Sequence, residues 1–92
     1  MKRLKQSKQF KKDLKRIQNT PRKLFSVNVV IGLLRETGTV PREYHPHLLT
    51  GIYRGYMECH IGSDFLLIWI DESRSTIRVL RVGSHSELFK KY

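Results

Sequence analysis

The stretch Phe65-Leu-Leu-Ile-Trp-Ile70 is apolar at odd and even positions alike, and it is the longest apolar run in the chain. Neighbouring side chains of a strand point to opposite faces of the sheet, so this pattern is typical of a central strand that is covered on both sides. Turn-forming residues flank the run, with Gly62-Ser63 before it and Asp71 to Ser75 after it. The sequence therefore predicts a sheet built around residues 65–70.

The segment Tyr53–Ile61 precedes this strand and alternates between two kinds of side chain. Every second residue is apolar or small, which predicts a strand with one face in the core. The opposite face carries a guanidinium, a phenol, a carboxylate and an imidazole, on Arg54, Tyr56, Glu58 and His60. A third strand is predicted at Ile77–Val82. We therefore expect a mainly antiparallel sheet with one face reserved for chemistry.

The first helix is predicted from Ser7, a good N-cap, to about Asn19. Phe10, Leu14 and Ile17 recur at helical spacing and mark its buried stripe. Ten of the eighteen basic residues lie between residues 2 and 23, with a single acid among them. Exposed helices usually mix charges, so this surface indicates a landing site for a polyanion. The residues expected to bind RNA or the ribosome are Lys8, Lys11, Lys12, Lys15, Arg16 and, from the strand, Arg54.

A second helix is predicted directly after the first, because Thr20-Pro21 supplies an N-cap followed by proline at the first helical position. Gly38 ends it. So short a connection makes the two helices an antiparallel hairpin, and Ser84 can cap a last short helix that runs through Phe89. We expect an α+β fold in one domain, residues 1–92, with the hairpin on one face of the sheet and the other face open.

Composition restricts the partners and the compartment. The formal net charge of +10 favours nucleic acid or another polyanion. Cys59 is the only cysteine, which excludes an intrachain disulfide and suits a reducing cytoplasm. No apolar run approaches the ~20 residues that a membrane span needs. We expect a soluble cytoplasmic protein that has no membrane partner.

Three of the four histidines lie between Tyr44 and Asp64. They invite a metal site, but no paired Cys or His spacing builds a closed zinc site, so no metal and no cofactor is expected. Acid–base cleavage of RNA fits better, because the ribose 2′-OH attacks the adjacent phosphate once a base takes its proton and an acid protonates the leaving oxygen. Arg54 or Arg81 can hold the charge that develops on the phosphate.

The ordered motifs resemble one family. His47-Leu-Leu-Thr-Gly51, the hairpin His60-Ile-Gly-Ser-Asp64 and the ending Gly83-Ser-His-Ser-Glu-Leu-Phe89 are similar to the YafQ branch of the RelE superfamily of bacterial toxin–antitoxin modules. The likeness covers about half of the chain. Leu48 stands where the family usually has proline, and Phe65 stands where it usually has tryptophan.

The resemblance implies a ribosome-dependent messenger RNA endonuclease with a microbial-ribonuclease-like fold, which an acidic antitoxin silences. It places the family's functional positions on His47, His60, Asp64, His85 and Phe89, with Arg81 as a further match; His45 does not match. Two alternatives stay open. One is a non-catalytic basic protein that binds nucleic acid or the ribosome, and the other is a toxin-like fold that only binds an antitoxin. Phosphate binding alone does not need the histidines and the aspartate, because Lys and Arg do that work.

Overall fold

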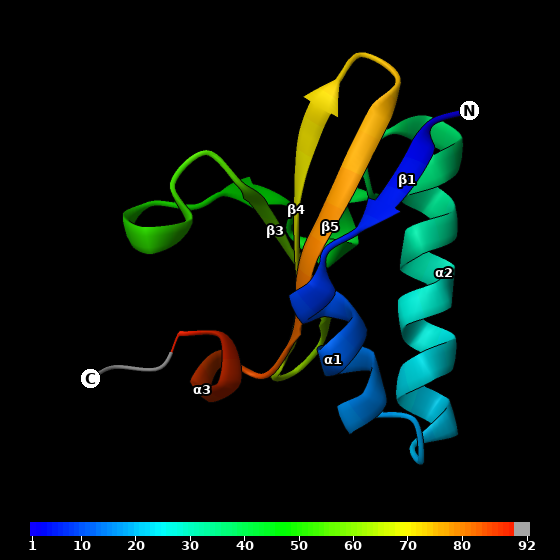
Figure 1. Ribbon diagram of the computed structural model, residues 1–92, viewed down its shortest axis with the longest axis vertical. Helices are drawn as coiled ribbons and strands as arrows, with labels where there is room; N and C mark the ends of the chain where they lie inside the picture. Colours follow the sequence, from blue (N-terminus) through cyan, green and yellow to red (C-terminus); the bar gives the residue numbers. More distant parts are fainter. Residues whose placement is uncertain (90–92) are drawn as a thin grey trace.

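Five strands form one mixed sheet in the computed structural model, which describes residues 1–89 (Figure 1). The strand order is β1-β5-β4-β3-β2. Only β1 and β5 are parallel, and all other neighbours in the sheet are antiparallel. The end of the expected domain, residues 90–92, lies outside the described residues. The strands are β1 (Arg3–Gln6), β2 (His47–Leu48), β3 (Met57–Gly62), β4 (Phe65–Ser73) and β5 (Thr76–Gly83).

The apolar run of residues 65–70 occupies the centre of the sheet, as the sequence predicts. It opens β4, which pairs with β3 on one side and β5 on the other. Leu67 and Trp69 pack into the larger core, under the helices, while Leu66 and Ile68 pack into a smaller core on the opposite face. All four side chains are essentially inaccessible to solvent. An unbroken apolar strand is needed here because both of its faces are covered.

Two antiparallel helices, α1 (Lys8–Arg16) and α2 (Pro21–Thr37), lie on one side of the sheet (Figure 1). The Ser7 side chain accepts a hydrogen bond from the Phe10 amide at 2.9 Å, which confirms the predicted N-cap. Gly38 closes α2 in the left-handed conformation, at φ 84°, and donates to the Leu34 carbonyl. Both predicted helix boundaries are therefore right to within a few residues. None of the helices within residues 1–89 has the length and apolar character that crossing a membrane requires.

The predicted strand Tyr53–Ile61 is wrong over its first four residues, because β3 begins only at Met57. Residues Gly51–Tyr53 form a 3-10 turn, η2, and Gly55 has a φ of 91° that side chains rarely tolerate. A second turn, η1, covers Arg42–Tyr44. Arg54 thus lies in a turn and does not share a strand face with His60. The side chains of residues 53–56 alternate as in a strand, but these residues do not form one.

The second face of the sheet is partly covered, although the sequence predicts an open face. The short helix α3 (His85–Leu88) and the segment after β2 lie on this side. Leu88 is 2% exposed and joins Leu66 and Ile68 in the smaller core. Tyr53 fixes this arrangement, since its hydroxyl donates to the Leu88 carbonyl at 2.8 Å. The part of this face beside β3 carries the histidines.

Helix α1 protects the edge of β5 beyond the end of β1. The strand pairing of β1 stops at Gln6 opposite Val79. From there Ser7 donates through its amide to the Val79 carbonyl at 3.1 Å and through its hydroxyl to the Leu80 carbonyl at 2.7 Å. The Asp13 carboxylate then accepts the Val82 amide at 3.0 Å. Helix side chains thereby satisfy backbone groups that a bare sheet edge would leave unpaired.

Candidate active site

On the face that carries β3, His47, His60 and His85 form a histidine row, and His45 lies beside His60. The ring centre of His60 is 5.8 Å from that of His45, 6.0 Å from that of His47 and 6.3 Å from that of His85. They come from the loop before β2, from β2 itself, from β3 and from the start of α3. Residues that are far apart in the sequence therefore meet around His60. The structure brings together His47, His60 and His85, as the family resemblance implies, and adds His45.

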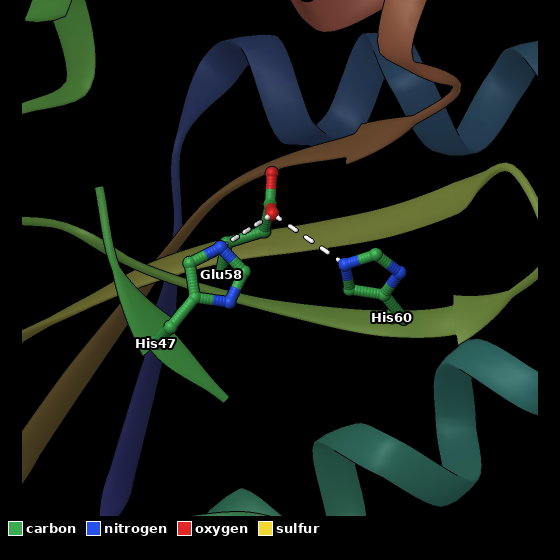
Figure 2. A group of neighbouring side chains, drawn as sticks. All are labelled: His47, Glu58 and His60. Atoms are coloured by element: carbon green, nitrogen blue, oxygen red, sulfur yellow. Dashed lines mark ion pairs between the residues drawn. The ribbon is translucent and has the colours of Figure 1, made fainter. Parts of the chain in front are cut away.

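Glu58 lies between two of these imidazoles (Figure 2). Its Oε1 is 3.0 Å from Nε2 of His47 and 3.8 Å from Nε2 of His60. Glu58 and His60 are two residues apart on β3 and so share a face, while His47 is the direct cross-strand partner of Glu58. Glu58 is only 3% exposed, and its Oε2 has no hydrogen-bond partner within the described residues. The carboxylate that faces the imidazoles is therefore almost completely shielded from solvent.

The ring orientation of His47 is fixed by the backbone. Its Nδ1 is 2.9 Å from the carbonyl oxygen of His45, and because a carbonyl can only accept, Nδ1 carries the hydrogen. The other nitrogen, Nε2, then faces Glu58. His45 itself has a φ of 52°, a left-handed conformation that directs its carbonyl toward the His47 ring. The loop before β2 therefore sets the tautomer of His47.

Asp64 and His85 form a second pair at the other end of the row. The carboxylate of Asp64 accepts the backbone amide of His85 at 2.9 Å and its ring Nδ1 at 3.0 Å. These two hydrogen bonds lower the pKa of Asp64, which remains ionised at neutral pH. An ionised carboxylate only accepts, so Nδ1 of His85 carries a hydrogen and Nε2 is directed away from Asp64. Ser84 caps α3 and holds His85 in its first turn.

Phe89 forms an aromatic wall beside His85. Its ring centre lies 5.9 Å from the His85 ring and 5.3 Å from the Tyr53 ring, in an edge-to-face contact with the latter. Because the Tyr53 hydroxyl is tied to the backbone of α3, the three rings are positioned together. The wall is half-buried and offers an apolar surface of the kind on which a nucleobase can stack.

Arg81 is bound to a buried acid. Its Nε and one terminal nitrogen donate to the two oxygens of Asp13 at 2.8 and 3.1 Å, and the other terminal nitrogen is 3.4 Å from the Tyr53 hydroxyl. The hydrogen bond to Asp13 raises the pKa of Arg81 above its ordinary value. The Arg81 side chain is 15% exposed. Asp13 already neutralises much of the Arg81 charge. The contacts of Arg81 with Asp13 and Tyr53 order Tyr53 and the neighbouring part of the sheet.

The basic residues predicted to bind RNA occupy two different settings. Lys8, Lys11, Lys12 and Lys15 are exposed on α1, and none of them forms an ion pair with any other residue in the range 1–89. Arg16 differs, because it reaches Asp13 at 3.3 Å and Glu87 of α3 at 3.7 Å. Arg54 is exposed in the turn before β3. The α1 lysines, unlike Arg16, are therefore not engaged by any acid within residues 1–89.

One group within the site has the composition of a metal site: His47, Glu58 and His60, whose ligand atoms all lie within 4.8 Å of one another. The sequence pattern offered His45, His47, Cys59 and His60 as possible ligands but not Glu58, and it predicted no metal site. Cys59 is fully buried on the opposite face, and burial raises the pKa of its thiol to about 12. The thiol therefore takes no part in the site.

Three residues of the site were not among the functional residues predicted from the sequence, namely Glu58, Asp13 and Tyr53, although Glu58 was placed on the polar face of its strand. Two of them had a readable signal. Asp13 follows Phe10 by three positions and so falls on the buried stripe of α1, where an ionised group needs a partner. Glu58 alternates with His60 on the polar side of the strand. Tyr53 gave no signal, because its role depends on a contact with α3, 35 residues later.

Nearly the whole chain matches one family of known proteins. Residues 2–90 match the family model described as a bacterial toxin of type II toxin–antitoxin system, YafQ. The chain is 31% identical to the mRNA interferase toxin YafQ of Escherichia coli K12 over 84 residues, which covers 90% of each protein.

Two solved structures resemble the whole fold. The toxin chain of the Escherichia coli DinJ–YafQ toxin–antitoxin complex superimposes with a TM-score of 0.82 at 29% identity, covering 96% of this chain and 97% of that one. A copper-bound mutant toxin from Helicobacter pylori gives a TM-score of 0.84 at 32% identity, covering 97% of this chain and 100% of that one. The predicted α+β fold of the RelE type is confirmed.

Proposed function

The chain belongs to the YafQ family of bacterial type II toxins, and we propose that it is a metal-independent endoribonuclease that cuts messenger RNA on the ribosome and so stops translation. The name of its Escherichia coli relative, an mRNA interferase toxin, supports this activity. The observation that carries the proposal is the histidine row, which has a carboxylate against it at each end. A protein that only bound phosphates would not need this arrangement.

The proposed reaction begins at the Glu58 end. Glu58 and His47 face each other at 3.0 Å and together accept the proton of the ribose 2′-OH, which then attacks the adjacent phosphorus. The bond that breaks joins phosphorus to the 5′-oxygen of the next nucleotide. The products are a 2′,3′-cyclic phosphate and a 5′-hydroxyl end. His60 lies between the two ends of the row and donates to the non-bridging oxygens, where charge develops.

His85 acts as the general acid in this proposal. Asp64 orients its ring through Nδ1, which leaves Nε2 to deliver a proton to the departing 5′-oxygen. The His60 and His85 ring centres are 6.3 Å apart, so both imidazoles can reach oxygens of the same phosphate. Phe89 stacks on a base next to the cleavage point. Arg81 is a positioning residue, because it touches Tyr53 and Asp13.

Two basic surfaces guide the RNA and the ribosome to this site. The unpaired lysines of α1 supply the long-range attraction expected from a formal charge of +10. Nearer the site, a groove of about 520 Å³ runs from Asp64 to the start of α2, where Arg22 and Lys23 line it. Lys23 lies over the Phe65 ring, with its nitrogen 5.3 Å from the ring centre. The groove can take a phosphate of the strand beyond the cleavage point.

The proposed regulator is an antitoxin. The relative in the DinJ–YafQ complex binds its antitoxin, and the strong positive charge of this chain suits an acidic partner segment. We place both proteins in the cytoplasm, where messenger RNA is translated. An antitoxin that covers the histidine row or the α1 lysines would prevent access to the ribosome.

The decisive experiment is single-turnover cleavage of a messenger RNA bound to purified ribosomes, with product ends analysed chemically. Wild type should yield 2′,3′-cyclic phosphate and 5′-hydroxyl ends. Replacing His85→Ala should slow cleavage by ~10²–10⁴, the range for loss of a general acid or base. The matched control is His45→Asn, which removes the neighbouring imidazole but tolerates the left-handed backbone.

Different outcomes separate the competing functions. If His85→Ala cleaves within about threefold of wild type, His85 is not the acid, because such a change is far below the expected range. If wild type binds ribosomes without cutting any messenger, the non-catalytic binding function is correct. Products with a 3′-hydroxyl and a 5′-phosphate would exclude attack by the 2′-OH.

A further inference from the structure

The buried carboxylate of Glu58 uses only half of its bonding capacity. Oε1 faces His47 and His60, whereas Oε2 is buried and has no hydrogen-bond donor within residues 1–89. Buried polar atoms in folded proteins are nearly always paired with a donor, a water molecule or an ion. The proposed cleavage reaction supplies no donor to Oε2. The Glu58 carboxylate therefore has capacity left to bind a positively charged partner.

The two closest atoms of the group carry lone pairs toward each other. Nδ1 of His47 donates to the His45 carbonyl at 2.9 Å, so in the neutral ring Nε2 has no hydrogen. That nitrogen lies 3.0 Å from the negatively charged Oε1 of Glu58. Two electron-rich atoms at this distance repel each other unless a positive species lies between them. A proton is one such species, and a metal ion is the other.

The positions of the donor atoms suit a metal ion. Histidine nitrogen and carboxylate oxygen bind transition metals at ~2.0–2.2 Å, so two donors on one ion lie about 3–4 Å apart. Oε1 of Glu58 is 3.0 Å from one imidazole nitrogen and 3.8 Å from the other. The side chains of His47 and His60 are 47% and 36% exposed, so small ring movements can close the remaining gap.

The outer contacts of the group are also those of a metal site. Ligating histidines usually donate their second ring nitrogen to a carbonyl or carboxylate, which orients the ring and raises its basicity. The bond from His47 to the His45 carbonyl is such a contact. Two imidazoles and one carboxylate favour Cu²⁺ and Zn²⁺, with Cu²⁺ bound more tightly, whereas Mg²⁺ and Ca²⁺ prefer all-oxygen sites.

We propose that His47, Glu58 and His60 bind one Cu²⁺ or Zn²⁺ ion, and that the bound ion turns off cleavage; the inhibitory part rests on the proposed function. The lone pairs that would bind the metal are the same lone pairs that would accept the proton during cleavage. A metal on Oε1 of Glu58 and Nε2 of His47 occupies the pair that would accept the 2′-OH proton, and a metal on His60 removes its donor nitrogen. A site that is loaded with metal therefore has no base.

The binding test uses Cu²⁺ and electron paramagnetic resonance on metal-free protein without an affinity tag. Wild type should bind one Cu²⁺ per chain, with nitrogen couplings from two imidazoles. Glu58→Gln, which keeps the shape but removes the charge, should weaken binding at least ~10-fold, since even changes to outer contacts cost that much. His60→Asn should leave couplings from one imidazole. His45→Asn, which keeps the carbonyl that holds His47, should bind as wild type does.

Two binding results would overturn the site. One is a Glu58→Gln variant that retains the wild-type affinity and spectrum, and the other is a His45→Asn variant that binds as weakly as His60→Asn; either result would place the ion elsewhere. Circular dichroism of each variant verifies the fold. If Glu58→Gln does not fold, His60→Asn decides alone, because that side chain is 36% exposed and its replacement leaves the core intact.

The inhibition test measures messenger cleavage against free Cu²⁺. The free Cu²⁺ concentration that halves the cleavage rate should equal the dissociation constant measured by electron paramagnetic resonance, and a chelator should restore the rate. Full cleavage at saturating Cu²⁺ would overturn the inhibitory part. If metal-free wild type cuts no messenger, the proposed function fails, whereas the copper spectra still decide the metal site. The two failures are thus distinguishable.

Discussion

Asp13 is the residue whose removal should destabilise this fold most for the size of its side chain. That side chain is completely buried, and it accepts four hydrogen bonds, two from Arg81, one from the Val82 amide and one from Arg16. Asp13→Ala leaves Arg81 with only a long contact to the Tyr53 hydroxyl, at 3.4 Å, and leaves the Val82 amide without an acceptor. The perturbation therefore creates one uncompensated cation and one orphaned buried donor.

The expected cost follows from these contacts. Removing one partner of a buried ion pair costs ~3–5 kcal/mol, a figure that already includes the donors left unpaired. A domain of this size has a free energy of unfolding of roughly 5–15 kcal/mol, so the variant should lose a large part of its stability. Asp13→Asn retains an acceptor for the Val82 amide and should cost less, about 1.5–3 kcal/mol for the missing charge-assisted bonds.

Urea denaturation, followed by the fluorescence of the buried Trp69, measures this cost. The double variant Asp13→Leu with Arg81→Met should recover much of the stability, because apolar replacement of a buried pair is often neutral. High salt should leave the cost of Asp13→Ala nearly unchanged, since a buried pair is screened weakly. A cost below about 1 kcal/mol for Asp13→Ala, the size typical of a surface pair, would refute the argument.

Three further predictions follow from other parts of the molecule. Asp64→Asn should have a lower unfolding midpoint than wild type at neutral pH. The two midpoints should converge as the pH falls below 3.8, because the lowered pKa of Asp64 means that its bonds to His85 stabilise the fold only while it is ionised. Gly38→Ala should cost about 1–2 kcal/mol at its φ of 84°, whereas Gly32→Ala, a control with open space around it, should stabilise α2 by ~0.5–1 kcal/mol. The third change neutralises four lysines of α1, namely Lys8, Lys11, Lys12 and Lys15. It should reduce the log–log salt slope of ribosome binding by up to ~0.9 for each phosphate that the protein no longer neutralises. An unchanged slope would remove α1 from the interface.

The helices and the central strand could be predicted because their signals are local. The stripe of α1, the proline at the start of α2 and the glycine after it each fix a boundary within a few residues. The continuous apolar run fixed the centre of the sheet. The turn at residues 51–56 was misread because its alternating side chains imitate a strand, and only the positive φ of Gly55 breaks the pattern.

The site was harder to predict because it depends on short and distant pairings. Strand β2 has two residues, too few for any periodicity, yet its pairing alone brings His47 opposite Glu58. The family resemblance supplied His85 and Asp64, and their contact joins residues 21 positions apart. Nothing local marks Glu58 as buried, since burial comes from β2 on one side and from Ile68 of β4 on the other.

The contact between α1 and β5 joins the basic surface to the proposed catalytic end. The Asp13 carboxylate holds Arg81, which contacts Tyr53, and Tyr53 holds the backbone of α3 at Leu88. Arg16 spans the same two helices through Asp13 and Glu87. The exposed lysines lie on the outer surface of the same helix and touch none of these groups. Substitutions on the outer surface should therefore alter ribosome affinity alone, whereas substitution of Asp13 should lower stability and also displace His85, so its cleavage rate should fall even in the fraction that remains folded.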